Sequence, residues 1–363
     1  MNKRNGIRLD VLQQDYLLSW LLVGIYNHPL LKESLVFKGG TALKKCYFGE
    51  YRFSEDLDFT ATSEAPNSSV LLAALTEVCK DAKDLMNEYA PIELEIKRYE
   101  EKEPHPHGQE AFSFHGMFPW QREPLTKVMV EVSREENLLL SPLLKPLLHN
   151  YGEVVDQQVK TYALEEIVLE KLRAILQHTK KLHERDFSRS RARDYYDLWR
   201  ILRMFDNHLS LKLIRSLLPM KCSKKGVSFR GVEDFFDEKM ISHVKRTWNQ
   251  WLGPLVSDLP KCELVLDELR NKLPVMIRFT NPELVLAELI QNSGLKNRDL
   301  YQACERVIRA GADVNQAMEG LTPFQLAVLG NNKPLADLVL SNGGRKIRPP
   351  GLGYVNLYNL YKE

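Results

Sequence analysis

Two neighbouring stretches decide the fold: Val36–Leu43 reads VFKGGTAL, and Arg52–Phe59 reads RFSEDLDF. The first runs from apolar residues into a glycine turn, as a strand that ends in a tight connection does. In the second, Asp56 and Asp58 alternate with apolar residues, which is the pattern of a half-buried strand. Because alternate side chains of a strand share a face, we expect both carboxylates to point the same way while Leu57 points into a core.

The paired aspartates indicate a metal site. Two carboxylates side by side repel each other unless a cation lies between them, and oxygen ligands of this kind suit Mg²⁺. The backbone N–H groups of a glycine turn can bind a phosphate. The sequence therefore predicts a site for a metal-bound nucleoside triphosphate, formed by Asp56, Asp58, Gly39, Gly40 and Thr41.

A third carboxylate is expected from the stretch Thr126–Ser133, which reads TKVMVEVS. Lys127, Met129 and Glu131 share one face of this alternating strand, and three valines share the other. An unpaired charge buried in so apolar a strand is costly, so Glu131 is a candidate to join the two aspartates as a metal ligand. The alternative is an exposed glutamate on an edge strand.

The composition is that of an ordinary soluble globular protein. The chain has 363 residues, of which 44% are apolar and 27% charged, and its formal net charge is +2. No overall field therefore demands nucleic-acid binding. No apolar run is long enough to span a membrane. The five cysteines are scattered without a zinc or disulfide spacing, which suits a reducing cytoplasm.

The order of the expected elements predicts an α+β fold, with a mixed αβ half followed by a helical half. Helices are expected over residues 7–27 and 69–89, and strands over 57–60, 92–99, 111–117 and 126–133, with 150–159 as a connector. From Tyr162 to about Ile290 the pattern is mostly helical. We expect a core domain over 1–160, a helical domain over 161–290 and a tail over 291–363.

Two polar anomalies interrupt the apolar faces of the helical half. Lys171 falls inside the apolar arc of the helix over 162–178. It either extends along its stem to solvent or faces a cleft that holds an anion. Asp194 lies within the apolar arc of the next helix, and Asp197 lies at its edge. A buried aspartate needs a cationic partner, for which the candidates are Arg193, Arg185 and Lys171.

The run between these two helices is basic. It contains Lys180, Lys181, Arg185, Arg189, Arg191 and Arg193. A solvated face is the default interpretation of such a run. Beside a nucleotide site, the same run could contact RNA phosphates.

The tail carries a pattern similar to ankyrin repeats. Arg309–Asn315 reads RAGADVN, and Glu319–Ala327 reads EGLTPFQLA. In an ankyrin unit, Gly-x-Thr-Pro sets the turn and the start of the first helix, and about three units are needed for an array to stand alone. We therefore expect the tail to lean on the helical domain or on a partner. Structural packing and a protein-docking surface are the two alternatives for its role.

Four separated motifs together resemble a known family. Lys38–Thr41 and Arg52–Phe59 are similar to the signature of the AbiEii/AbiGii nucleotidyltransferase toxins, members of the polymerase-β-like nucleotidyltransferase superfamily. Glu170–Ala174 and Arg193–Leu198 resemble the two helical motifs of that family. The resemblance covers about residues 10–275. It implies a polymerase-β-like nucleotidyltransferase core with a mixed sheet, followed by a helical domain that completes the active site. The ankyrin-like tail lies outside the usual family plan.

The resemblance implies metal-assisted nucleotidyl transfer. Asp56 and Asp58 would hold two Mg²⁺ ions roughly 3.5–4 Å apart. Glu131, which stands where the family often has an aspartate, would share one ion and help to activate the attacking hydroxyl.

The resemblance also implies a set of nucleotide-binding residues. The glycine turn would hold the β- and γ-phosphates, and Lys171 would neutralise the triphosphate. Asp194, oriented by Arg193, would position the nucleotide or the acceptor. Arg52 and Ser54 would brace the aspartate strand. The full set of nucleotide-binding candidates is Lys38, Gly39, Gly40, Thr41, Arg52, Ser54, Lys171 and Arg193.

The family implies a toxin of a bacterial toxin–antitoxin or phage abortive-infection pair. Its substrate is an NTP, its expected acceptor is RNA at the tRNA 3′ end, and its effect is a block of translation. A cognate antitoxin is the expected protein partner. One alternative is a nucleotidyltransferase that modifies a protein hydroxyl or a small molecule. Another is a degenerate transferase that acts as a binding module through its tail, which the intact carboxylates argue against.

Overall fold

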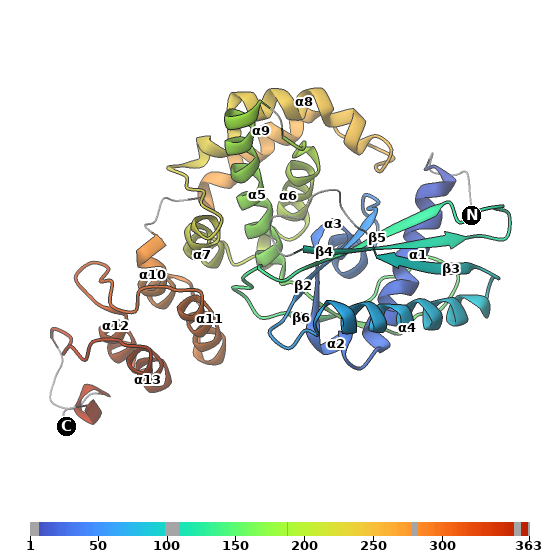
Figure 1. Ribbon diagram of the computed structural model, residues 1–363. Coiled ribbons are helices and arrows are strands. Elements are labelled where there is room, and N and C mark those ends of the chain that lie inside the picture. Colours follow the sequence, from blue (N-terminus) through green and yellow to red (C-terminus); the bar gives the residue numbers. More distant parts are fainter. Residues whose placement is uncertain (1–6, 99–108, 187, 278–281, 352–356, 362–363) are drawn as a thin grey trace. The chain divides into compact units, whose positions relative to one another are not determined.

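The structure is a computed structural model that describes residues 7–98, 109–186, 188–277, 282–351 and 357–361 (Figure 1). The chain forms two compact units. The first comprises residues up to 136, 142–163 and 249–259, and the second comprises 137–141, 164–248 and 260 onward. The carboxylate strands belong to the first unit, and both helical motifs belong to the second.

A seven-stranded mixed sheet forms the centre of the first unit, in the order β3-β4-β5-β2-β1-β7-β6. β2 is parallel to β5 and β1 is parallel to β7, whereas the other neighbouring pairs are antiparallel. The expected α+β fold with a mixed sheet is thereby confirmed. The strands are β1 (Leu35–Lys38), β2 (Asp56–Ala61), β3 (Glu93–Arg98), β4 (Gln109–Met117), β5 (Thr126–Ser133), β6 (Leu143–Pro146) and β7 (Gln158–Thr161).

Two long helices complete the core of the first unit. α1 (Leu9–Asn27) and α4 (Ser68–Asn87) pack against each other, and they contact β5 and β3 respectively. The apolar side chains that alternate with the aspartates are buried, as the pattern predicts: Leu57 and Phe59 have no exposed surface. The ring of Phe59 lies 5.3 Å from that of Phe37 on β1, centre to centre. Burial of these rings fixes which face of β2 turns away from the core.

The glycine turn follows β1 directly and opens a short helical segment. That segment consists of α3 (Gly39–Ala42) and a π-helical stretch (Leu43–Phe48), after α2 (Leu31–Ser34) and β1. The returning segment 249–259 joins the same unit, because the N–H of Phe53 donates to the carbonyl of Leu255 at 3.0 Å. The stretch before β2 is therefore held from a distant part of the sequence.

The second unit is helical. α5 packs against α6 and α7, and α10 packs against α7, α11 and α12. No helix among the described residues is long and apolar enough to cross a membrane. The α-helices are α5 (Leu164–Arg185), α6 (Ala192–Met204), α7 (Leu211–Ser223), α8 (Glu238–Leu252), α9 (Cys262–Lys272), α10 (Val285–Asn292), α11 (Asn297–Arg309), α12 (Pro323–Leu329) and α13 (Lys333–Ser341). Short 3₁₀ helices span Asp206–His208, Val232–Phe236, Leu273–Val275, Pro282–Leu284 and Leu357–Tyr361.

The Gly-x-Thr-Pro turn of the tail starts a helix, as its sequence predicts. The hydroxyl of Thr322 accepts a hydrogen bond from the N–H of Gln325 at 3.3 Å, and the Gln325 side chain accepts one from the N–H of Thr322 at 2.8 Å. This reciprocal cap begins α12, which packs against α13. The ankyrin interpretation of these helices stays a prediction.

Candidate active site

Three neighbouring strands of the first unit place a row of charged residues on one face of the sheet. Lys38 of β1 pairs with Asp58 of β2, and Asp58 pairs with Glu131 of β5. Asp56 lies two residues before Asp58 and pairs with Met129, so it shares that face. All three expected carboxylates thus come together on one face, and each is partly exposed.

The alternative in which Glu131 lies on an edge strand is wrong. β5 lies inside the sheet, between β4 and β2. The carboxylate of Glu131 accepts a hydrogen bond from the side chain of Gln109 on β4. Glu131 therefore stands beside the aspartate strand with a neutral donor on its other side.

Both glycines of the turn lie close to polar side chains of the candidate site. Gly39 has φ +79°, and a Cβ added to it would lie 2.4 Å from Oδ2 of Asp58. A Cβ added to Gly40 would lie 2.2 Å from a guanidinium nitrogen of Arg52. The Asp58 carboxylate and the Arg52 guanidinium can therefore lie this close to the turn backbone because the two glycines have no side chains.

Polar side chains tie the turn to the aspartate strand. The hydroxyl of Thr41 donates to the backbone carbonyl of Asp56 at 2.5 Å, and Arg52 donates to the carbonyl of Phe53 at 3.1 Å. Thr41, Arg52 and Ser54 are all buried. The Lys38 ammonium, also buried, lies 5.9 Å from the centre of the Tyr162 ring. Thr41 thus positions the turn through its hydroxyl, a contact that the sequence did not indicate.

The chemistry of the carboxylate row suits a hard divalent cation, because its donors are all oxygens. In the described part of the chain, however, no group of three or more His, Cys, Asp or Glu side chains is gathered so that it could hold a metal ion. Asp56, Asp58 and Glu131 share a face without forming such a group, and their role as metal ligands stays a prediction.

The second unit holds a buried ion cluster around Lys171. Its ammonium lies 3.1 Å from Oδ1 of Asp194 and 2.6 Å from Oδ2 of Asp197. These two ion pairs connect α5 with α6. Lys171 is 7% exposed, which excludes the alternative that it extends to solvent. Arg191 lies 3.0 Å from Oδ2 of Asp194. Burial raises the pKa of Asp194, but the charges of Lys171 and Arg191 lower it by more than burial raises it. The pKa of Asp194 therefore lies below its usual value.

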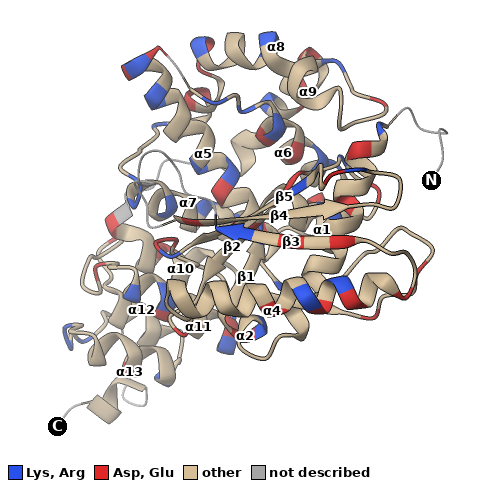
Figure 2. Ribbon diagram, turned by 45° about the vertical axis from the view of Figure 1, so that its right-hand side comes forward, with Lys and Arg blue, Asp and Glu red and all other residues tan. Residues whose placement is uncertain are grey.

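Lys171 was one of the expected partners of Asp194 and contacts it, but sequence reasoning missed the second partner, Arg191. Arg191 was placed only in a basic run, and Arg193 was expected to orient Asp194. The signal was the spacing, because residues three apart on a helix face each other whereas adjacent ones do not. Arg191, Asp194 and Asp197 follow at intervals of three. The positions of Lys and Arg on α5 and α6 are blue in Figure 2.

A histidine lies beside the same cluster. The Nδ1 atom of His178 lies 2.6 Å from the hydroxyl of Ser188. Burial and the charges of Arg191 and Lys181 lower the pKa of His178 to about 3. His178 is therefore a neutral imidazole at physiological pH, held among cations.

Comparisons with known proteins show the family and a similar fold. A family model described as "Nucleotidyl transferase AbiEii toxin, Type IV TA system" matches residues 20–273. The structure is similar to that of MenT4, a nucleotidyltransferase toxin from Mycobacterium tuberculosis H37Rv, with a TM-score of 0.51 and 20% sequence identity. That similarity covers 83% of this chain and 92% of the other. No curated protein matches the chain significantly.

Proposed function

Because the chain belongs to the AbiEii family of nucleotidyltransferase toxins from type IV toxin–antitoxin systems, we propose that it transfers a nucleotide from an NTP to RNA in a Mg²⁺-dependent reaction. The expected acceptor is the tRNA 3′ end, and the expected effect is a block of translation in the cytoplasm. The observation that carries this proposal is the carboxylate row of β2 and β5 beside the glycine turn.

The three carboxylates and the two turn glycines of the first unit have proposed roles in that reaction. Asp56 and Asp58 would hold the metal ions, and Glu131 would share one of them and accept the proton of the attacking hydroxyl. When bound, the ions supply Lewis-acid stabilisation of the charge on the phosphates. Gly39 and Gly40 carry no side chains of their own and lie beside Asp58 and Arg52, and their N–H groups are the proposed hydrogen-bond donors to a phosphate.

The second unit contributes predictions of its own. Lys171 is expected to neutralise charge on the triphosphate, and Asp194 to position the nucleotide or the acceptor. Both are engaged in the buried ion cluster of α5 and α6, which gives them fixed orientations. Arg191 joins them as a candidate, because it holds Asp194 in place.

The toxin family implies a cognate antitoxin as the protein partner. The tail is a candidate docking surface for a protein. A nucleotidyltransferase with a protein or small-molecule acceptor is the second candidate, since one metal site serves many acceptors and the fold does not choose among them.

The decisive experiment incubates purified protein with total RNA, Mg²⁺ and each labelled NTP in turn. Asp58→Ala should keep the fold and abolish both transfer and toxicity, because it removes the central carboxylate of the row. Asp81→Ala, which removes an exposed carboxylate on α4, is the matched control and should leave both unchanged.

Each outcome of that experiment has a clear meaning. Label in a tRNA-sized band that is lost in Asp58→Ala would support the proposal and identify the nucleotide. Label in protein bands would move the acceptor to a protein hydroxyl. An Asp58→Ala variant that stays fully toxic would refute the proposed site.

A further inference from the structure

Two residues of α1 contact β5 and the segments that adjoin β2 and the glycine turn. The contacts come from Gln14 and Asp15, which precede the residues matched by the family model. Neither residue belongs to the carboxylate row or to the turn, but each is hydrogen-bonded to residues that adjoin them in the sequence or on the same strand.

Gln14 bridges the two carboxylate strands. Its side-chain Nε2 donates to the backbone carbonyl of Glu55 at 3.0 Å and to that of Lys127 at 2.7 Å. Glu55 immediately precedes Asp56, and Lys127 lies on β5 ahead of Glu131. One amide therefore holds the beginnings of both strands from which the carboxylates project.

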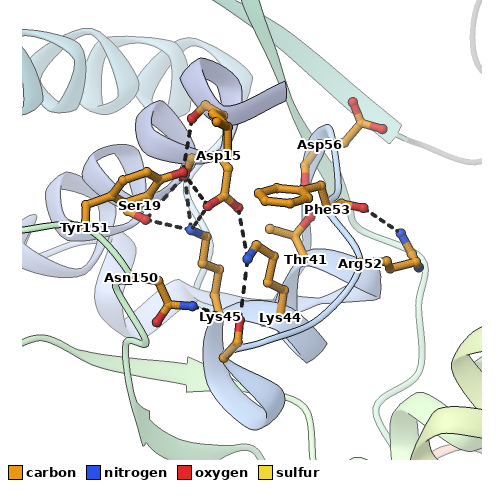
Figure 3. A network of polar contacts seen from close by, with 12 residues as sticks. Asp15, Ser19, Thr41, Lys44, Lys45, Arg52, Phe53, Asp56, Asn150 and Tyr151 are labelled. Atoms are coloured by element: carbon orange, nitrogen blue, oxygen red, sulfur yellow. Dashed lines mark hydrogen bonds and ion pairs between the residues drawn. The ribbon is translucent and has the colours of Figure 1, made fainter. Parts of the chain in front are cut away.

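Asp15 holds the helical segment that the glycine turn opens. Asp15 is 1% exposed, and its Oδ2 accepts hydrogen bonds from the ammonium of Lys45 at 2.9 Å and from the hydroxyl of Tyr151 at 2.8 Å. Lys45 also donates to the backbone carbonyl of Asp15 at 3.1 Å and to the hydroxyl of Ser19 at 2.8 Å. Figure 3 shows this ammonium enclosed by oxygen atoms from α1.

Lys44 extends the same cluster towards the aspartate strand. Its ammonium lies 3.8 Å from Oδ1 of Asp15 and 3.4 Å from the carbonyl of Gly49. It also lies 4.4 Å from the centre of the Phe53 ring, in the stretch that leads into β2 (Figure 3). Burial of two ammonium groups beside one carboxylate is costly, so this cluster is not explained by stability alone.

We propose that Gln14 and Asp15 are positioning residues for nucleotidyl transfer. Gln14 sets the two carboxylate strands relative to each other, and Asp15 sets the glycine turn relative to them. The inference rests on the proposed function, because positioning matters only if the row and the turn bind the metal and the triphosphate.

The Gln14 arm of the test compares Gln14→Leu with Gln13→Leu. Gln13 is the matched control, since it is the preceding glutamine of α1, and its buried Nε2 donates no hydrogen bond among the described residues. We expect Gln14→Leu to lower kcat about 10-fold while KM for the NTP stays within about 2-fold, because misplaced reacting groups slow the chemical step. Gln13→Leu should retain the wild-type kcat.

The Asp15 arm uses Asp15→Asn and the double variant Asp15→Asn/Lys45→Met. The single variant leaves two buried ammonium groups beside a neutral residue and is at risk of unfolding. The double variant removes one charge of each sign, so the net charge of the cluster is unchanged. We expect it to fold and to raise KM for the NTP about 10-fold, with a smaller change in kcat.

Calorimetric binding of each Mg²⁺–NTP complex separates this inference from the proposed function. If the wild type binds an NTP but transfers nothing, the proposed function and the role of Gln14 both fail. In that case, weaker NTP binding by the double variant would still support the role of Asp15. Equal kcat for Gln14→Leu and Gln13→Leu overturns the role of Gln14. An unchanged KM and binding constant in the folded double variant overturns that of Asp15. A wild type that binds no NTP overturns the whole inference.

Discussion

Replacing Gly39 with alanine should slow transfer about 100-fold without unfolding the protein. The new Cβ would lie 2.4 Å from Oδ2 of Asp58, whereas ordinary van der Waals contact begins at 3.4 Å. The carboxylate oxygen must therefore retreat by about 1 Å, and a displacement of that size in a catalytic group costs about 100-fold in rate. The φ of +79° adds strain that destabilises the folded state by about 1–2 kcal/mol.

Gly320→Ala separates these two effects. Gly320 has φ +81°, and a Cβ added there would meet nothing within 4 Å. It should therefore show the same loss of stability in urea unfolding with no loss of kcat. If Gly39→Ala transfers nucleotide at a rate within about threefold of Gly320→Ala, the reasoning that the turn must stay open for Asp58 is refuted.

Two further predictions concern the ion cluster of the second unit. Asp197→Asn should lower the free energy of unfolding by about 3 kcal/mol, because it breaks a buried pair at 2.6 Å from Lys171. Urea unfolding measures this, and Asp10→Asn, in an exposed pair with Arg8, should show no change. In the folded state the pKa of His178 is lowered to about 3, whereas in the unfolded chain it is 6.5. Between these two pH values the unfolded chain binds a proton at His178 and the folded protein does not. The free energy of unfolding should therefore fall as the pH drops through this window. His178→Gln should lose that part of the pH dependence in unfolding curves recorded from pH 7 to pH 4. An unaltered pH dependence in this variant would contradict the lowered pKa of His178.

The parts of the fold that the sequence predicted are those with a strong local pattern. Period-two alternation in Thr126–Ser133 and in the aspartate stretch predicted β5 and β2, and the order of elements predicted a mixed sheet followed by helices. The stretch 150–159 was taken for a connector, yet β7 begins within it and pairs with β1 and β6. A strand of four residues is too short to show alternation, and its pairing depends on distant partners.

The candidate site likewise has a part that local sequence patterns predict and a part that depends on contacts between distant residues. Local periodicity was enough to put Asp56 and Asp58 on one face, but the register that sets Glu131 against Asp58 comes from the sheet. The hydrogen bonds from Gln14 to the carbonyls of Glu55 and Lys127 join residues far apart in the sequence, and no local sequence pattern predicts them. Lys171 was among the expected partners of Asp194 and contacts it. The second partner, Arg191, could also have been predicted, because helical spacing favours Arg191 over Arg193.

The carboxylate row on β2 and β5 is not an arrangement that favours the stability of the sheet. Asp58 and Glu131 face each other on neighbouring strands, an arrangement of like charges that weakens a sheet. Lys38 lies opposite Asp58 on β1, and the Gln109 amide donates to Glu131, so both of these carboxylates have a neighbour that offsets part of the repulsion. The row still holds more carboxylates than ammonium groups once Asp56 is counted. A divalent cation bound there would relieve the remaining repulsion, and because it binds only the folded state, it would stabilise the fold as well as the reaction.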